Sequence, residues 1–155
     1  MNRWSQRSLE QRQGCDERLQ RLFDRVLETI DCSWLEGYRN PYRQTVLYEE
    51  KKTKVKHGKH NVFPSEAADV APYPVRWPKK PGLIKRFWLK PLNKWMKDYA
   101  RFYAFGGFVQ GTAVEMKRHG ELDCDIRSGM DWDRDWDLQD QNFDDLQHHE
   151  ILEED

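Results

Sequence analysis

The segment FDDLQHHEIL, residues 143–152, places acidic side chains beside two adjacent histidines. Asp145 precedes His148 by three residues, so a tight turn would fold its carboxylate over a metal ion held by His148. A carboxylate placed there can accept the proton of a metal-activated water, which is the role of a general base. Neighbouring strand positions point to opposite faces, so we expect His149 to face away from such a metal. The alternative is that both histidines are ordinary surface residues.

A second group of metal-ligating residue types lies in GKHNVFPSEAADVAPYP, residues 58–74. His60 falls in an expected loop, and Asp69 follows inside a short apolar strand. A carboxylate between Ala68 and Val70 is costly to bury unless it is paired or bound to a cation. The alternative for Asp69 is a hydrogen-bonding residue at the end of the strand. Catalytic zinc needs three protein ligands and one open position, and the chain has no HExxH motif, so its ligands must come from separated segments.

The composition indicates a folded protein that does not span a membrane. Aromatic residues make up 13% of the 155 residues, whereas disordered chains are poor in them. The mean hydropathy is −1.02, and no apolar run approaches the ~20 residues that cross a bilayer. The N-terminal segment lacks the apolar stretch of a secretory signal. An odd number of separated cysteines argues against a zinc cluster or a disulfide framework and predicts small buried or half-buried thiols at Cys15, Cys32 and Cys124.

The charge is unevenly distributed along the chain. Residues 121–155 hold 14 acids against Arg127 and Arg134, a net charge of −12, so residues 1–120 carry +11 of the total of −1. A basic body attracts anionic polymers, nucleic acid among them. The sequence shows no RNA-binding aromatic motif, no zinc finger and no basic helix with base-reading side chains. Nucleic acid is therefore not the expected partner.

Helices and short strands alternate without a βαβ rhythm, which favours an α+β fold. Apolar spacing predicts a helix over residues 8–30, broken near Gly14, with Asp16 capping the second piece. Asn40 and Pro41 form a turn that starts another helix. Short strands are expected at CSWLEGY, at residues 67–70 and at HHEIL, whereas KKTKVKHGKH, residues 51–60, reads as a basic loop.

The longest helical pattern runs from Asn93 to His119 and contains Gly106, Gly107 and Gly111. Glycine inside a helix costs roughly 1 kcal/mol relative to alanine, so either another backbone packs closely there or the helix breaks. Residues 74–91 are rich in proline and are expected to form an irregular connection. DWDRDWDLQDQNFDD is expected to be an acidic loop.

Several short motifs occur in an order that is typical of one enzyme family. They are EGYRNPYRQ, then KHN and PSEAADVAPYP, then RFYAFGGFVQG, then GMDWDRD and FDDLQHHE. In this order the chain, from about Ser8 to Leu152, resembles phage endolysins of the L-alanyl-D-glutamate peptidase branch of the zinc D-alanyl-D-alanine carboxypeptidase family. The resemblance implies a small α+β domain whose antiparallel sheet carries a zinc site and packs against helices.

The resemblance also implies roles for particular residues. Asp145 matches the catalytic acid and base, and Arg39 matches an arginine that binds substrate and stabilises the developing oxyanion. Gln44 matches a glutamine of the same substrate-binding element, with a positional role. His149 stands where the family usually has an aromatic residue. The residues that match the three zinc ligands are His60, Asp69 and His148.

The chain departs from the family pattern at a few positions. Gly58 stands where a serine often precedes the first zinc histidine, Met130 replaces one of two glycines, and Glu66 occupies a commonly hydrophobic position. The serine change removes a substrate hydrogen bond in this comparison. The metal ligands themselves are unaffected.

The implied function is a zinc metallopeptidase, an endolysin that degrades peptidoglycan by cutting the stem peptide between L-Ala and D-Glu with one catalytic Zn²⁺. The resemblance places it in the cytoplasm of a bacteriophage-infected host, acting on the cell wall after membrane permeabilisation, with host lysis and antimicrobial activity as consequences. We expect a monomer with one catalytic domain over residues 1–155, no separate cell-wall-binding domain, no nucleic-acid partner and no stable membrane insertion.

Two other functions remain open from the sequence. A D,D-carboxypeptidase or dipeptidase of the same family would carry the same metal motif. A non-catalytic module that binds cell wall or nucleic acid would also fit the basic body.

The acidic loop raises the question of a second cation. Its acids alternate, as in calcium loops, where every second side chain reaches one hard cation through oxygen. Trp136 stands where an EF-hand loop has its turn glycine, and Asn142 stands where it has its final glutamate. We therefore hypothesise a Ca²⁺ site at this loop, against the alternative of a solvated acidic surface. The candidate ligands are Asp131, Asp133, Asp135 and Asp137.

Overall fold

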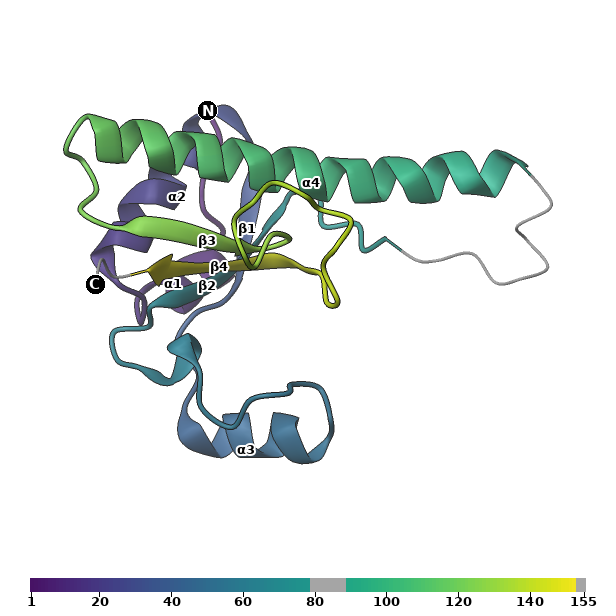
Figure 1. Cartoon of the computed structure of the whole chain (residues 1–155). Coiled ribbons are helices and arrows are strands. Elements are labelled where there is room, and N and C mark those ends of the chain that lie inside the picture. The colour runs from purple at the N-terminus through teal and green to yellow at the C-terminus, as the bar shows by residue number, and fades with distance from the viewer. Residues whose placement is uncertain (79–88, 153–155) are drawn as a thin grey trace.

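The computed structural model describes residues 1–78 and 89–152 and shows an α+β fold, as predicted (Figure 1). One antiparallel sheet of four strands has the order β1-β2-β4-β3. Long helix α4 crosses the sheet, and Figure 1 shows α3 standing apart at the opposite side of the molecule. In chain order the elements are α1 Gln6–Arg12, α2 Glu17–Thr29, β1 Cys32–Glu36, α3 Pro41–Glu49, the 3₁₀ helix η1 Lys59–Asn61, β2 Ala67–Pro72, α4 Leu89–Arg118, β3 Asp125–Gly129 and β4 Asp145–Leu152.

The N-terminal helices follow their sequence signals. The predicted break near Gly14 is confirmed, and the Asp16 carboxylate caps α2 by accepting from the backbone N–H of Arg18 at 2.8 Å. Asn40 caps α3 in the same way, with Pro41 in the first turn of the helix. The apolar stripe of α2 packs into the main core, which includes Leu19, Leu22, Phe23, Val26 and Leu27.

The two faces of the sheet serve different purposes. Val70 of β2 pairs with Trp34 of β1, and both side chains are buried in the core that the sheet forms with the helices. Successive strand residues point to opposite faces, so Asp69 and His148 project from the face that does not pack on α2. One face of β2 and β4 is therefore core, and the other carries polar groups.

Helix α4 is continuous through its glycines, so the alternative of a break at these residues is excluded. It also begins at Leu89, before the predicted Asn93, and ends at Arg118. A Cβ added at Gly106 would lie 2.5 Å from the Met130 sulfur, whereas one at Gly107 or Gly111 would meet nothing within 4 Å. Close packing thus explains Gly106 alone. Most of the irregular connection expected over 74–91 lies outside the described residues.

Strand β3 was not predicted, because DIRSG has a single large apolar residue and therefore no visible alternation. It forms an edge of the sheet and pairs with β4, which begins at Asp145 rather than at His148 as expected. All three cysteines are buried, as predicted, and burial raises the pKa of Cys15 and of Cys32 to about 12. Among the described residues, no helix is both long enough and apolar enough to cross a membrane.

Candidate metal centre and active site

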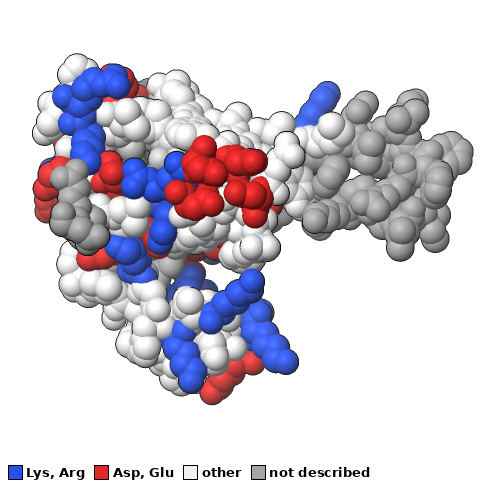
Figure 2. Space-filling view, in the orientation of Figure 1, with Lys and Arg blue, Asp and Glu red and all other residues white. Residues whose placement is uncertain are grey.

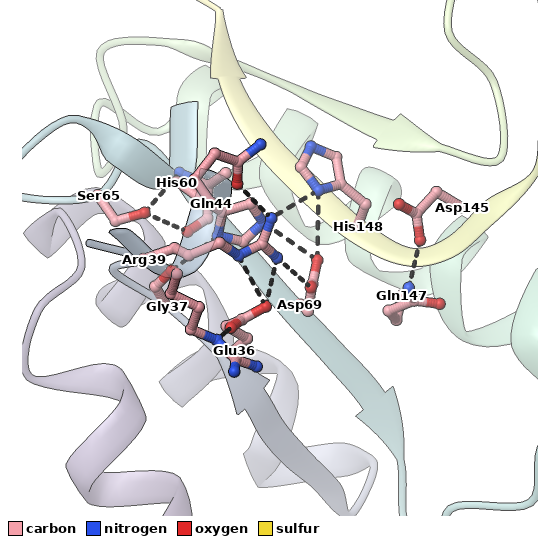
Figure 3. Close-up of polar contacts among 12 residues, drawn as sticks. Glu36, Gly37, Arg39, Gln44, His60, Ser65, Asp69, Asp145, Gln147 and His148 are labelled. Carbon is pink, nitrogen blue, oxygen red and sulfur yellow. Dashed lines mark hydrogen bonds and ion pairs between the residues drawn. The ribbon is translucent and has the colours of Figure 1, made fainter. Parts of the chain in front are cut away.

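Three predicted ligands meet at one point on the polar face of the sheet (Figure 3). Asp69 Oδ1 lies 3.3 Å from His60 Nε2 and 3.3 Å from His148 Nδ1. The two histidine nitrogens also lie 3.3 Å from each other. The three atoms therefore form a triangle with equal sides.

The sheet and one loop bring these residues together. Asp69 on β2 lies directly opposite His148 on β4 in the antiparallel register. His60 comes from η1, and its position is fixed by the chain after β1: the Arg39 backbone N–H donates to the His60 carbonyl at 2.7 Å. The loop expected at His60 is thus a short 3₁₀ turn that contacts β2.

Each histidine has its outer nitrogen held by an acceptor. His60 Nδ1 lies 2.7 Å from the Gly37 carbonyl, so Nδ1–H donates and the Nε2 lone pair faces the triangle. His148 Nε2 lies 3.0 Å from Glu150 Oε2, so Nε2–H donates and Nδ1 faces the triangle. Second contacts of this kind fix the tautomer and ring orientation of metal-binding histidines.

The triangle has the dimensions of a zinc site. Tetrahedral zinc with bonds of about 2.0–2.1 Å places neighbouring ligand atoms roughly 3.3–3.4 Å apart. Two imidazole nitrogens and one carboxylate oxygen are also the donor types that zinc prefers in hydrolases. With the outer protons committed to Gly37 and Glu150, three electron-rich atoms face one another, which favours a cation between them. The residues therefore fit a zinc ion.

The charges around the triangle favour the same conclusion. Burial raises the pKa of Asp69, but its contacts with His148 and His60 outweigh burial and hold that pKa well below the usual range. Burial lowers the pKa of His148, whereas Asp69 and Glu150 raise it to about 9 overall. A metal cation and a proton compete for the same lone pair on Nδ1. Without a cation, the raised pKa of His148 keeps a proton on Nδ1 beside the Asp69 carboxylate, and a metal bound at the triangle would displace this proton.

Asp145 lines the same cleft as the triangle, as its predicted role requires. The tight turn expected between Asp145 and His148 is wrong, because both residues lie in β4. The register of β3 and β4 shifts between Ser128 and Gly129, and this irregularity places Asp145 opposite Gly129. A Cβ at Gly129 would lie 2.5 Å from the Asp145 carbonyl oxygen, so only glycine permits this approach.

The environment of Asp145 suits proton transfer. Burial, followed by the negative charge of Asp69, raises the pKa of the Asp145 carboxyl above its ordinary value. Its carboxylate accepts a hydrogen bond from the Gln147 side-chain amide. A carboxylate with a raised pKa is a stronger base and holds an accepted proton more readily.

Arg39 points into the cleft and is held by two neighbours (Figure 3). Its guanidinium donates to the Glu36 carboxylate through Nε at 3.0 Å, and through Nη1 to Gln44 Oε1 at 2.9 Å. Its Nη2 also lies 3.8 Å from Asp69 Oδ2. The arginine is thus fixed beside the triangle.

Gln44 connects Arg39 to the basic loop. Its side chain is buried, and its amide donates to the Val55 carbonyl at 2.6 Å while its oxygen accepts from Arg39. Gln44 also lines the cleft, but both ends of its amide are engaged within the protein. Gln44 therefore links Arg39 to the segment that contains Val55.

Three further residues were not identified from the sequence. Glu36 holds Arg39, and Glu150 holds His148 while accepting from Arg127 Nε at 2.9 Å. Glu150 was detectable, since it lies two residues after His148 and must share its face of a strand. Arg127 was not, because strand β3 carries no clear pattern.

His149 faces the core, as predicted. Its ring is fully buried and packs edge to face against Phe23, with a centroid separation of 5.3 Å, and against Phe105 at 6.3 Å. Neither ring nitrogen has a hydrogen-bond partner in the described part of the chain. Burial lowers the pKa of His149 to about 3, so the ring is neutral and takes the place of an aromatic side chain.

The acidic loop contains one close group of carboxylates. Asp131, Asp133 and Asp135 each offer an oxygen, and these oxygens lie within 4.8 Å of one another; Asp137 is outside this group. The Asp131 carboxylate also accepts backbone N–H groups from Arg134 at 2.9 Å and from Trp136 at 3.2 Å. Asp131 therefore shapes the loop itself.

Comparison with known proteins identifies a fold relative. No protein-family model matches the chain, and no curated protein sequence matches it. The structure is similar to the crystal structure of Serratia marcescens L-Ala D-Glu endopeptidase ChiX, with a TM-score of 0.63 and 18% sequence identity. The match covers 97% of this chain and 91% of that one. The two proteins therefore share a fold.

Proposed function

We propose that this protein is a zinc-dependent peptidoglycan endopeptidase. The observation that carries the proposal is the equilateral triangle of His60, Asp69 and His148, which fits zinc. Asp145 and Arg39 line the same cleft of about 600 Å³. The structural relative is an L-Ala D-Glu endopeptidase, which supports a peptidase acting on the same kind of substrate.

The residues divide the chemistry of peptide hydrolysis among them. Zinc held by the triangle would act as a Lewis acid and lower the pKa of a water in its open position. Asp145 accepts the proton of the attacking water and later delivers it to the leaving amine. Arg39, held in place by Glu36 and Gln44, donates to the oxyanion that develops on the substrate carbonyl, a kind of contact worth ~3 kcal/mol.

The proposed bond is the one between L-Ala and D-Glu of the stem peptide. The sequence resemblance to phage endolysins and the activity of the structural relative support this choice. We also propose that the protein comes from a phage, has one catalytic domain and acts as a monomer. It would be made in the host cytoplasm and would reach the cell wall after the membrane is permeabilised.

Mass spectrometry of peptidoglycan digested by the zinc-loaded protein tests the proposal. The expected product carries a new amino group on D-Glu, and the Asp145→Asn protein should release none of it. Loss of terminal D-Ala would instead identify a carboxypeptidase. Binding without any cleavage, by protein shown to hold zinc, would reject the enzyme and leave a binding module.

A further inference from the structure

Lysines from the segment after α3 form one wall of the cleft. Lys51, Lys52 and Lys54, here called the lysine wall, all line it, and the opposite side includes Phe143 and Asp145. Figure 2 shows blue side chains over the lobe of α3 and its following segment, across a hollow from the red acidic loop. The cleft is therefore asymmetric in charge.

Two of the three lysines have a charge available for a ligand. Lys52 pairs with Glu50 at 2.8 Å. Within residues 1–78 and 89–152, neither Lys51 nor Lys54 forms an ion pair with an acid. The Lys54 ammonium lies 5.0 Å from the centre of the Phe143 ring on the opposite side, so it reaches across the cleft.

The backbone holds the lysine wall in a defined place. Lys51 has φ of 57°, in the left-handed region that non-glycine residues seldom adopt. Backbone hydrogen bonds fix this turn: Lys51 N–H donates to Tyr48 at 3.0 Å, and Lys52 N–H donates to Leu47 at 2.8 Å. Strained positions of this kind are concentrated at functional sites.

The lysine wall is also tied to the catalytic residues. Gln44 donates to the Val55 carbonyl at 2.6 Å, one residue after Lys54, and accepts from Arg39 at 2.9 Å. One buried amide thus sets the distance between the lysine segment and the arginine beside the metal triangle. A substrate bound at the triangle would meet the lysines at a fixed separation from its scissile bond.

We propose that Lys51 and Lys54 bind free carboxylates of the stem peptide and make the enzyme select carboxylate-bearing stems over amidated ones. This inference rests on the proposed function. A D-Glu linked through its side chain keeps a free α-carboxylate, and amidation removes that charge without changing the peptide's length. Each exposed ion pair changes binding about 1.4- to 5-fold, so two give a measurable preference.

Paired synthetic peptides of one sequence, with free or with amidated carboxylates, test the inference. KM and kcat are measured for zinc-loaded wild type and for the double variant Lys51→Gln/Lys54→Gln. The control is Lys56→Gln: Lys56 belongs to the same segment, but its ammonium lies 5.2 Å from the Tyr48 ring centre and it does not line the cleft.

Wild type should have a KM about 2- to 25-fold lower for the free peptide, with added salt reducing the difference. The double variant should lose this preference, whereas Lys56→Gln should keep it. Equal KM values for both peptides in wild type, or a double variant that weakens both equally, would overturn the inference and leave the endopeptidase proposal standing. Cleavage of neither peptide by zinc-loaded protein would overturn both.

Discussion

Oε2 of Glu150 lies 3.0 Å from Nε2 of His148, and this contact decides which nitrogen of His148 faces the metal triangle. Arg127 on the neighbouring strand lies opposite Glu150 and donates to its other oxygen. Burial raises the pKa of Glu150, but His148 and Arg127 outweigh burial and lower it to about 2. The ionised Glu150 carboxylate therefore holds the His148 ring from the side opposite the metal triangle.

Replacement of Glu150 should weaken metal binding. Glu150→Gln keeps the shape but removes the charge that orients His148, so we expect zinc affinity to fall about 10- to 100-fold in a chelator competition titration. The matched control is Glu66→Gln, which removes a carboxylate that pairs with Lys59 at 3.1 Å and does not line the cleft. Equal zinc affinities in the two variants would show that Glu150 does not support the site.

Asp145→Asn should retain the metal and the fold but lose hydrolysis. An amide cannot accept the water's proton, and removal of a general base costs about 10²–10⁴-fold in rate. Turnover, zinc content and melting temperature are measured together, with the exposed neighbour Asp144→Asn as control. Near-normal turnover in Asp145→Asn would remove this residue from the mechanism.

His149 should make the protein sensitive to acid. Its folded-state pKa of about 3 lies below the ordinary value of 6.5, so the unfolded chain binds the extra proton and stability falls as pH drops from 6.5 towards 3. Between pH 8 and pH 5, the free energy of unfolding should fall about 2 kcal/mol more in wild type than in His149→Phe.

Denaturant unfolding in the presence of chelator measures this difference without the contribution of bound metal. Zinc content at neutral pH is the control, since His149→Phe leaves all three proposed ligands in place. Parallel stability curves for the two proteins would contradict the effect of burial on His149.

Much of the site was readable from residue types, whereas its geometry depended on the register of the sheet. An aspartate within the apolar strand AADVA marked Asp69, and strand alternation separated His148 from His149. The position of Asp145 was misjudged because it depends on a register shift between β3 and β4 at Gly129. No local sequence pattern predicts such a shift. Arg127 was missed because β3 has too few apolar residues to be recognised.

Calcium binding at the acidic loop stays a prediction. Asp131, Asp133 and Asp135 lie close enough to share a cation, and neutralising their charges would order the segment before Asp145. For a site of millimolar affinity, 5 mM calcium should raise the melting temperature by about 2–4 °C, with a parallel rise in rate. Magnesium should do less because it demands a stricter octahedral geometry.

The Asp133→Asn/Asp135→Asn variant is the control for the calcium titration, with zinc held constant. It should lose the response, because both of these carboxylates are exposed and neither is needed to hold the Asp131 turn. If calcium changes neither the melting temperature nor the rate of the wild-type protein, the loop does not bind calcium and is only an acidic surface.

The zinc content of three purified proteins tests the central claim most directly. Wild type and His149→Phe should each hold about one zinc per chain after dialysis against metal-free buffer. His148→Ala should lose most of it, because the triangle then keeps two of its three ligand atoms. Zinc retained by His148→Ala, or lost equally from His149→Phe, would contradict a metal centre built on His60, Asp69 and His148.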